Sequence, residues 1–167
     1  TVDPERFMNL SKKNDIEDYV AYCGSVSNDK DGVDQLIQSF AIFSKDFPNV
    51  KLYIIGPILK SESLKNIRLI ESLGLVEKIV LTGVVSADKI PQLLKDAKLL
   101  LLDRPNNMQA NCGFATKIGE YLLTKNPIVL TKVGDFSLFF EDRKNIIFSQ
   151  PDDINDFADN MKWAYSN

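Results

Sequence analysis

The sequence predicts an α/β domain with a doubly wound, Rossmann-like parallel sheet of about six strands. Six short apolar runs recur along the chain, at residues 19–24, 51–56, 78–83, 98–103, 127–131 and 145–149. They are continuous rather than alternating, which is typical of strands covered on both faces. Segments of helical periodicity lie between them. Strand and helix therefore alternate, which favours right-handed crossovers and a single parallel sheet.

Three segments carry the clearest helical pattern, with apolar residues three or four positions apart. One follows the first predicted strand and spans 33–47, one follows the third and spans 90–97, and the last spans 154–165. The last begins after Asp152 and Asp153, which suit a helix N-terminus. Sheets of this class bind ligands at the carboxyl ends of their strands, near the point where strand order reverses. The loops at 24–32, 56–61 and 103–117 are therefore the places to look for function.

Composition narrows the possible functions. The chain has 167 residues, 44% of them apolar, and a net charge of −3. A chain of this length is expected to form one domain with a single hydrophobic core. Nonspecific binding to nucleic acid is not expected, because it needs clustered cations. The chain contains no His and only two Cys, Cys23 and Cys112. Zinc sites made of Cys and His, and Ser/His/Asp or Cys/His catalysis, are therefore excluded within this chain.

The ends and the apolar runs bear on location. No run approaches the ~20 apolar residues that span a bilayer, and the polar start TVDPERFMNLSKKND has no signal-peptide core. Two lone thiols fit a reducing compartment. We expect a soluble cytoplasmic protein, whose start resembles a linker and whose sequence is a piece of a longer chain.

The loop after the first strand has features of an anion site. Gly24 allows a ligand to approach the backbone, and Lys30 lies beside the start of the next helix. The alternative is a polar turn in which Lys30 is solvated between Asp29 and Asp31. The loop is not a Walker A motif. The two aspartates superficially resemble a metal-binding pair, but we expect no metal here, because acidic residues in a turn are usually solvated.

A second anion site is predicted after the fourth strand, where Gly113 precedes a helix expected to start near Thr116. A helix N-terminus offers free N–H groups to a diphosphate, and Glu120, one turn further on, offers acceptors for two ribose hydroxyls. The alternative is an exposed helix start in which Lys117 and Glu120 pair at spacing three.

Longer segments carry a family resemblance. The first loop followed by VDQLIQSFAIFSKDFPNVKLYIIG, then KIVLTGVVSADKIPQLLKDAKLLLL, then GFATKIGEYLLTKNPIVLTKVGD, resembles the C-terminal domain of GT-B glycosyltransferases of group 1, also called family 4. The resemblance implies one half of a GT-B fold. Residues 1–18 would be an interdomain linker remnant and 19–167 the nucleotide-sugar donor-binding domain. The N-terminal acceptor-binding domain would be absent from this chain.

The resemblance also implies roles for the phosphate-binding residues. Lys30 matches the lysine that holds the donor diphosphate, and Gly24 the glycine before it. Ser25 stands where the family usually has Arg, and Arg104 and Lys117 are the candidates to compensate. The start of the following helix, Gly113, Phe114, Ala115 and Thr116, would line the donor site.

Three further positions would bind the sugar, the ribose and the base. Glu120 matches the glutamate that binds ribose, and with Lys30 it would carry the activity of this half. Cys112 falls on a second family glutamate, which contacts the donor sugar, and a thiol cannot supply the same charge. Val84 and Val85 fall near the nucleobase, bound through backbone groups. The alternative is that these two are ordinary apolar loop residues.

The implied function is metal-independent transfer of a hexosyl group from a nucleoside diphosphate sugar to a glycan or lipid-linked acceptor. No cofactor is implied. The fragment itself would be inactive, and any membrane contact, at the inner face, would belong to the missing domain. One alternative is a sugar-nucleotide epimerase or phosphorylase of the same architecture, although no cofactor lysine or catalytic motif of that kind is present. The other is a non-catalytic nucleotide-binding or interaction domain. A flavodoxin-like receiver is excluded because its acidic cluster and lysine are missing.

Overall fold

A computed structural model of the chain describes residues 2–58 and 60–167. Its strands are β1 (Tyr19–Cys23), β2 (Lys51–Ile55), β3 (Ile79–Gly83), β4 (Leu99–Leu102), β5 (Ile128–Thr131) and β6 (Ile147–Ser149). The α-helices are α1 (Asn28–Asp31), α2 (Val33–Asp46), α3 (Lys60–Ser72), α4 (Ile90–Asp96), α5 (Met108–Cys112), α6 (Lys117–Thr124), α7 (Phe136–Phe139) and α8 (Ile154–Ser166). A 3₁₀ helix, η1 (Pro4–Phe7), precedes them.

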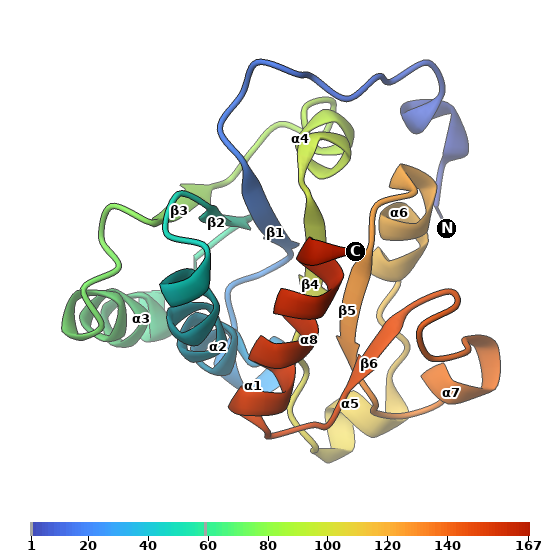
Figure 1. Ribbon diagram of the computed structural model, residues 1–167. Helices are drawn as coiled ribbons and strands as arrows, with labels where there is room; N and C mark the ends of the chain where they lie inside the picture. Colours follow the sequence, from blue (N-terminus) through green and yellow to red (C-terminus); the bar gives the residue numbers. More distant parts are fainter. Residues whose placement is uncertain (1, 59) are drawn as a thin grey trace.

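The strands form one six-stranded sheet in the order β3-β2-β1-β4-β5-β6, and every pair is parallel (Figure 1). This is the doubly wound order, in which the chain moves outward from β1 in one direction and then returns to build outward from β4. The prediction of a Rossmann-like parallel sheet of six strands is therefore confirmed. Each observed strand lies within the run that predicted it.

Helices cover both faces of the sheet (Figure 1). On one face α2 packs against α8 and α3, and α8 also contacts β4, β5 and β6. On the other face α4 packs against α6. The N-terminal segment carries η1 onto α6 and α4 before the chain enters β1.

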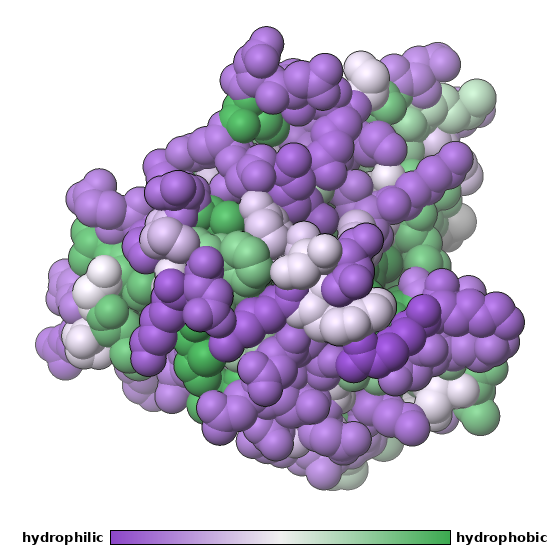
Figure 2. Space-filling view, viewed as in Figure 1, coloured by the Kyte–Doolittle hydropathy of each residue, from purple (hydrophilic) through white to green (hydrophobic). Residues whose placement is uncertain are grey.

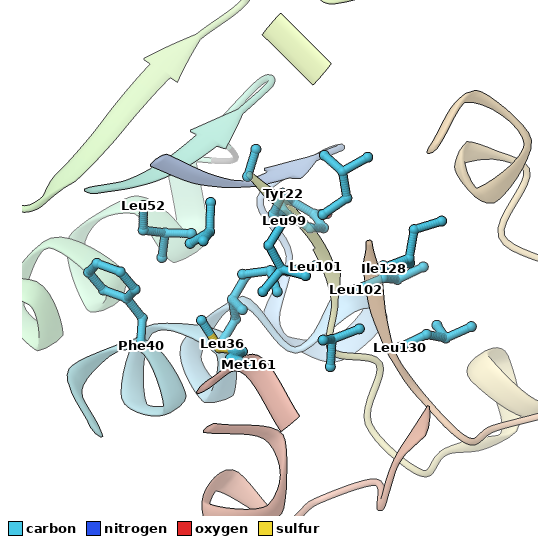
Figure 3. Packing of buried hydrophobic residues seen from close by; sticks show 14 of the residues in the cluster. Tyr22, Leu36, Phe40, Leu52, Leu99, Leu101, Leu102, Ile128, Leu130 and Met161 are labelled. Carbon is cyan, nitrogen blue, oxygen red and sulfur yellow. The ribbon is translucent and has the colours of Figure 1, made fainter. Parts of the chain in front are cut away.

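The core consists of side chains from the sheet and from the inner faces of α2 and α8. Figure 3 shows Leu36 and Phe40 of α2 and Met161 of α8 lying against strand residues such as Leu52 and Leu101. All five are fully buried. Burying one such side chain contributes about 1.5–3 kcal/mol, so this layer holds the helices on the sheet. The face seen in Figure 2 is mainly hydrophilic with scattered apolar residues. No helix in the described part of the chain is long and apolar enough to cross a membrane.

Two local predictions have clear outcomes. The helix expected near Thr116 is α6, which has Thr116 at its N-cap. The loop at 24–32 is not wholly irregular, because Ser27 caps the short helix α1 by accepting a hydrogen bond from the Lys30 N–H. Gly32 ends α1 with φ of 56°, a left-handed conformation that favours glycine. Of the segment 56–61, residue 59 and the side chains of 60 and 61 lie outside the described residues.

Asp103 gives the fold a testable pH dependence. Its side chain is 2% exposed directly after β4, and burial raises its pKa well above the usual range, with Asp152 and Asp34 adding to the effect. Below the ordinary Asp pKa of about 3.9 the carboxyl is neutral in both folded and unfolded states. As the pH rises further, the unfolded chain gains from ionisation before the folded one does. The native state therefore loses stability up to the folded pKa.

We therefore expect Asp103→Asn to raise the Tm at pH 7 and to have little effect near pH 4. Differential scanning calorimetry across this range measures both. Asp15→Asn is the control, because Asp15 is exposed and has no hydrogen bond or ion pair in the described part of the chain. A gain for Asp103→Asn that does not change with pH would contradict the assignment of a buried carboxyl.

Candidate functional site

The strand order reverses between β1 and β4, and the loops that follow these two strands meet there. A cavity of about 200 Å³ lies between them. Its lining comprises Lys30, Asp31, Arg104, Gln109, Gly113, Phe114, Ala115, Thr116 and Lys117. A larger hollow of about 560 Å³ lies beside the amino ends of β1 and β2, around Asp18 and Val50. We place the candidate site in the smaller cavity, because ligands of doubly wound sheets bind at the carboxyl ends.

A buried ion pair organises this cavity. Asp31, at the end of α1, is 2% exposed, and the Lys117 ammonium lies 2.7 Å from its Oδ2. The Tyr22 hydroxyl lies 2.7 Å from the same oxygen and 2.8 Å from the Ser25 carbonyl oxygen. Burial lowers the pKa of Lys117, and Asp31 opposes this shift. Burial together with Asp31 raises the pKa of Tyr22, so the phenol stays protonated at neutral pH.

Because Gly24 has no side chain, the Lys117 ammonium can lie against its backbone. A Cβ at position 24 would meet the Lys117 ammonium and the Tyr22 hydroxyl at less than contact distance. The ammonium also lies 4.6 Å from the centre of the Tyr22 ring, within the range of a cation–π contact. The lysine from α6 therefore reaches the loop after β1, beside Ser25, where the family's arginine is missing.

Arg104 serves the local backbone. Its side chain is 3% exposed and donates to the carbonyl oxygens of Ala110 and Gly113 at 3.2 and 2.7 Å, and to that of Gln109 at 3.3 Å. Its Nε lies 3.7 Å from Asp31 Oδ1 without a hydrogen bond. Arg104 thus stabilises the end of α5 and adds positive charge behind the cavity. Lys117 is the better placed of the two candidates to compensate for Ser25.

Lys30 and the start of α6 are available to a ligand. Within residues 2–58 and 60–167, no ion pair or hydrogen bond engages the Lys30 ammonium, and the side chain is exposed. Thr116 gives α6 no side-chain cap. The Ile118 and Gly119 N–H groups donate to the backbone carbonyl oxygens of Ala115 and Thr116, whereas no hydrogen bond in the described part of the chain engages the Thr116 and Lys117 N–H groups beside the cavity. Free N–H groups and the helix dipole both favour an anion. Lys30, Lys117 and Arg104 against one carboxylate give the cavity a positive balance.

A second cavity, of about 290 Å³, lies between the ends of β1, β2 and β3 and the segments that follow them. It is lined by Cys23, Gly24, Ser25, Ile55, Gly56, Pro57, Val84, Val85 and Ile90. Val84 is 82% exposed and Val85 is partly buried. Burial raises the pKa of the Cys23 thiol to about 11, so it is neutral at physiological pH. These small and apolar walls suit a flat, uncharged ring better than a charged group.

Glu120 lies one turn along α6 from Lys117, but the two do not pair. The Glu120 Oε1 accepts a hydrogen bond of 2.7 Å from Arg6 in η1, and the second guanidinium nitrogen of Arg6 donates to the Ala87 carbonyl oxygen. Lys117 pairs with Asp31 instead. The alternative of an exposed Lys117–Glu120 pair is therefore wrong.

Cys112 is exposed at the end of α5 and lines a small cavity of about 130 Å³ with Gly113, Phe114 and Asp135. Asp135 is the one carboxylate among the described residues lining it. A carboxylate is thus present close to Cys112, where the resemblance implies a glutamate.

Sequence reasoning missed Asp31, Tyr22, Asp135 and Arg6 as parts of this region. Asp31 was expected to be solvated like Asp29, and that expectation is wrong because Asp31 is buried against Lys117. The one feature of the sequence that could have indicated a role for Asp31 is its position next to Lys30, the candidate phosphate-binding lysine. No group of three or more His, Cys, Asp or Glu side chains placed to hold a metal occurs within residues 2–58 and 60–167.

The fold and the cavity together define a class: a doubly wound α/β domain with cations and a helix N-terminus facing a cavity at its switch point. The chain belongs to the family of group 1 glycosyl transferases, whose model matches residues 17–167. No curated protein matches the chain.

Solved structures share the fold. The C-terminal domain of LpcC, a group 1 family protein from Francisella tularensis, matches with a TM-score of 0.82 at 16% identity, covering 100% of this chain and 89% of that one. Anabaena HepE in complex with UDP and glucose gives 0.77 at 24% identity, over 90% and 39%. A mutant of S. aureus TarM in complex with fondaparinux, α-GlcNAc-glycerol and UDP gives 0.75 at 24% identity, over 96% and 31%. This chain thus spans less than two-fifths of the TarM and HepE chains. It has the architecture of one half of a GT-B fold.

The buried ion pair predicts a difference between two neighbouring aspartates. Asp31→Ala leaves Lys117 and Arg104 without their carboxylate, and we expect it to cost on the order of 3 kcal/mol in the free energy of unfolding. Asp29→Ala, at an exposed position two residues away, should change stability by less than about 0.5 kcal/mol. Urea denaturation followed by circular dichroism measures both. Equal effects would contradict the organising role of Asp31.

Proposed function

We propose that this domain binds the nucleoside diphosphate sugar of a glycosyltransferase. The observation that carries the proposal is the cavity at the switch point, where Lys30, Lys117 and the uncapped start of α6 converge. A diphosphate carries the charge and the acceptor oxygens that these groups would satisfy.

The two cavities divide the ligand. The diphosphate occupies the cationic cavity, and the base occupies the apolar cavity beside Val84 and Val85. Gly24 lines the apolar cavity, and the Lys117 ammonium, which lines the cationic one, lies against Gly24. The ribose lies between them, where Glu120 accepts hydrogen bonds from its hydroxyls. The donor sugar points toward Cys112 and Asp135.

In the whole protein, the acceptor hydroxyl oxygen forms a bond to the anomeric carbon of a hexosyl group as the bond to the diphosphate breaks, and the hydroxyl proton passes to the departing diphosphate. The leaving diphosphate gains negative charge in that step. Lys30, Lys117 and the dipole of α6 stabilise it, so this half needs no metal ion. A further domain of the same polypeptide binds the glycan or lipid-linked acceptor and carries any membrane contact. The UDP in the TarM and HepE complexes makes UDP the first nucleotide to test.

Isothermal titration calorimetry with UDP, GDP and ADP tests the donor site. One nucleotide is expected to bind saturably, and Lys30→Ala and Glu120→Ala should each weaken it by about tenfold or more, the scale of a charge-assisted hydrogen bond. Lys45→Ala and Glu71→Ala remove the same charges at exposed positions on α2 and α3 and should leave the affinity unchanged.

If a nucleotide binds but neither site variant weakens it, the cavity is the wrong site. If none of the three binds, the domain does not bind a donor nucleotide by itself, which favours a non-catalytic interaction domain.

Nucleotide binding with and without magnesium tests whether the donor site needs a metal ion. The dissociation constant of the bound nucleotide should differ by less than about twofold between buffers with magnesium and with EDTA, because protein cations neutralise the diphosphate. Loss of binding in EDTA would show that the diphosphate is held by a metal. Lys30→Ala in both buffers is the control, since a metal bridge would lessen the effect of losing the lysine.

A further inference from the structure

Arg6 connects the two parts of the proposed site that bind ribose and base. One guanidinium nitrogen donates to Glu120 Oε1 on α6 at 2.7 Å, and the other donates to the Ala87 carbonyl oxygen at 2.5 Å. Ala87 lies in the segment between β3 and α4 that also carries Val84 and Val85. A single side chain from η1 therefore bridges α6 and this segment.

The N-terminal segment is docked so that Arg6 is oriented. Asp3 caps η1 by accepting the Glu5 N–H, and Pro4 opens the helix with its fixed φ. Val2 packs on Gly119, where a Cβ would be only 2.5 Å from its Cγ2. Phe7 packs against the core. The segment thus contacts α6 through Val2 and the core through Phe7, and the guanidinium between them is held at the Glu120 carboxylate.

The contact changes what Glu120 can offer a ligand. With Oε1 fixed by Arg6, the carboxylate has a defined orientation, and no hydrogen bond or ion pair in the described part of the chain engages Oε2. The Glu120 side chain is still 23% exposed. A pre-oriented acceptor loses less side-chain freedom when a ligand hydroxyl binds, so affinity rises without a new contact.

We propose that Arg6 is a positioning residue for ribose recognition: it orients the Glu120 carboxylate so that Oε2 accepts from the ribose hydroxyls. This inference rests on the proposed donor site. It assigns residues 2–7 to the nucleotide-binding machinery, in addition to their place before the domain.

The test compares Arg6→Gln and Arg6→Lys with the unsubstituted chain. The ligands are the nucleotide that binds best among UDP, GDP and ADP, and its 2′,3′-dideoxy analogue. Arg6→Gln should weaken the ribonucleotide by about tenfold and the dideoxy analogue by less than twofold, because only the former uses Glu120. Arg6→Lys should recover part of the loss. In a Glu120→Gln background, Arg6→Gln should have no further effect.

Arg143→Gln is the control, since it removes a guanidinium that lies over Trp163 and outside the two cavities. Thermal unfolding of each variant shows whether η1 and the domain remain folded.

An equal loss of affinity for both ligands would overturn the proposal and leave Arg6 a general structural role. Tighter binding after Arg6→Gln would overturn it too, because Arg6 would then compete with ribose. If none of the three nucleotides binds the unsubstituted chain, the donor site fails and this inference with it. If they bind and only the Arg6 variants have no effect, this inference alone fails.

Discussion

The site depends on one buried carboxylate. Asp31 is 2% exposed and sits against the ammonium of Lys117 and the guanidinium of Arg104. Without that charge, the cations of Lys117 on α6 and of Arg104 after β4 would be buried without a negative partner, which is costly. With it, Lys117 can lie against Gly24, and Arg104 can hold the end of α5. The positive cavity is therefore possible because a negative group is buried behind it.

At the proposed donor site, this arrangement would compensate for Ser25, which stands where the resemblance implies an arginine. In the family pattern the cations come from one loop, after the first strand. Here Lys30 comes from that loop and Lys117 from α6, across the switch point. Tyr22, Gly24 and Asp31 are the residues that hold the Lys117 ammonium there.

The fold could be predicted almost entirely from sequence, and the site only in part. Continuous apolar runs such as 98–103 mark buried strands because the pattern is local. The start of α6 could also be predicted from neighbouring residues, because Gly113 and Thr116 are typical of the segment just before a helix. The partners of the site residues are not local: Asp31 lies 86 residues from Lys117, and Arg6 lies 114 residues from Glu120. Both pairs were missed because spacing along the chain reports only contacts within one helix or turn.

The Asp31–Lys117 ion pair also lies at the junction between the two halves of the sheet. β1 and β2 are in register over five residue pairs, whereas β1 and β4 share only Val20↔Leu99 and Ala21↔Leu100. This short seam and the packing of α2 against α8 unite the half containing β1–β3 with the half containing β4–β6. The ion pair crosses the seam at its carboxyl end, and an anion held by Lys30 and Lys117 would cross it again. Occupancy of the site would then reinforce the junction between the halves, so resistance to unfolding would rise with ligand concentration as mass action requires.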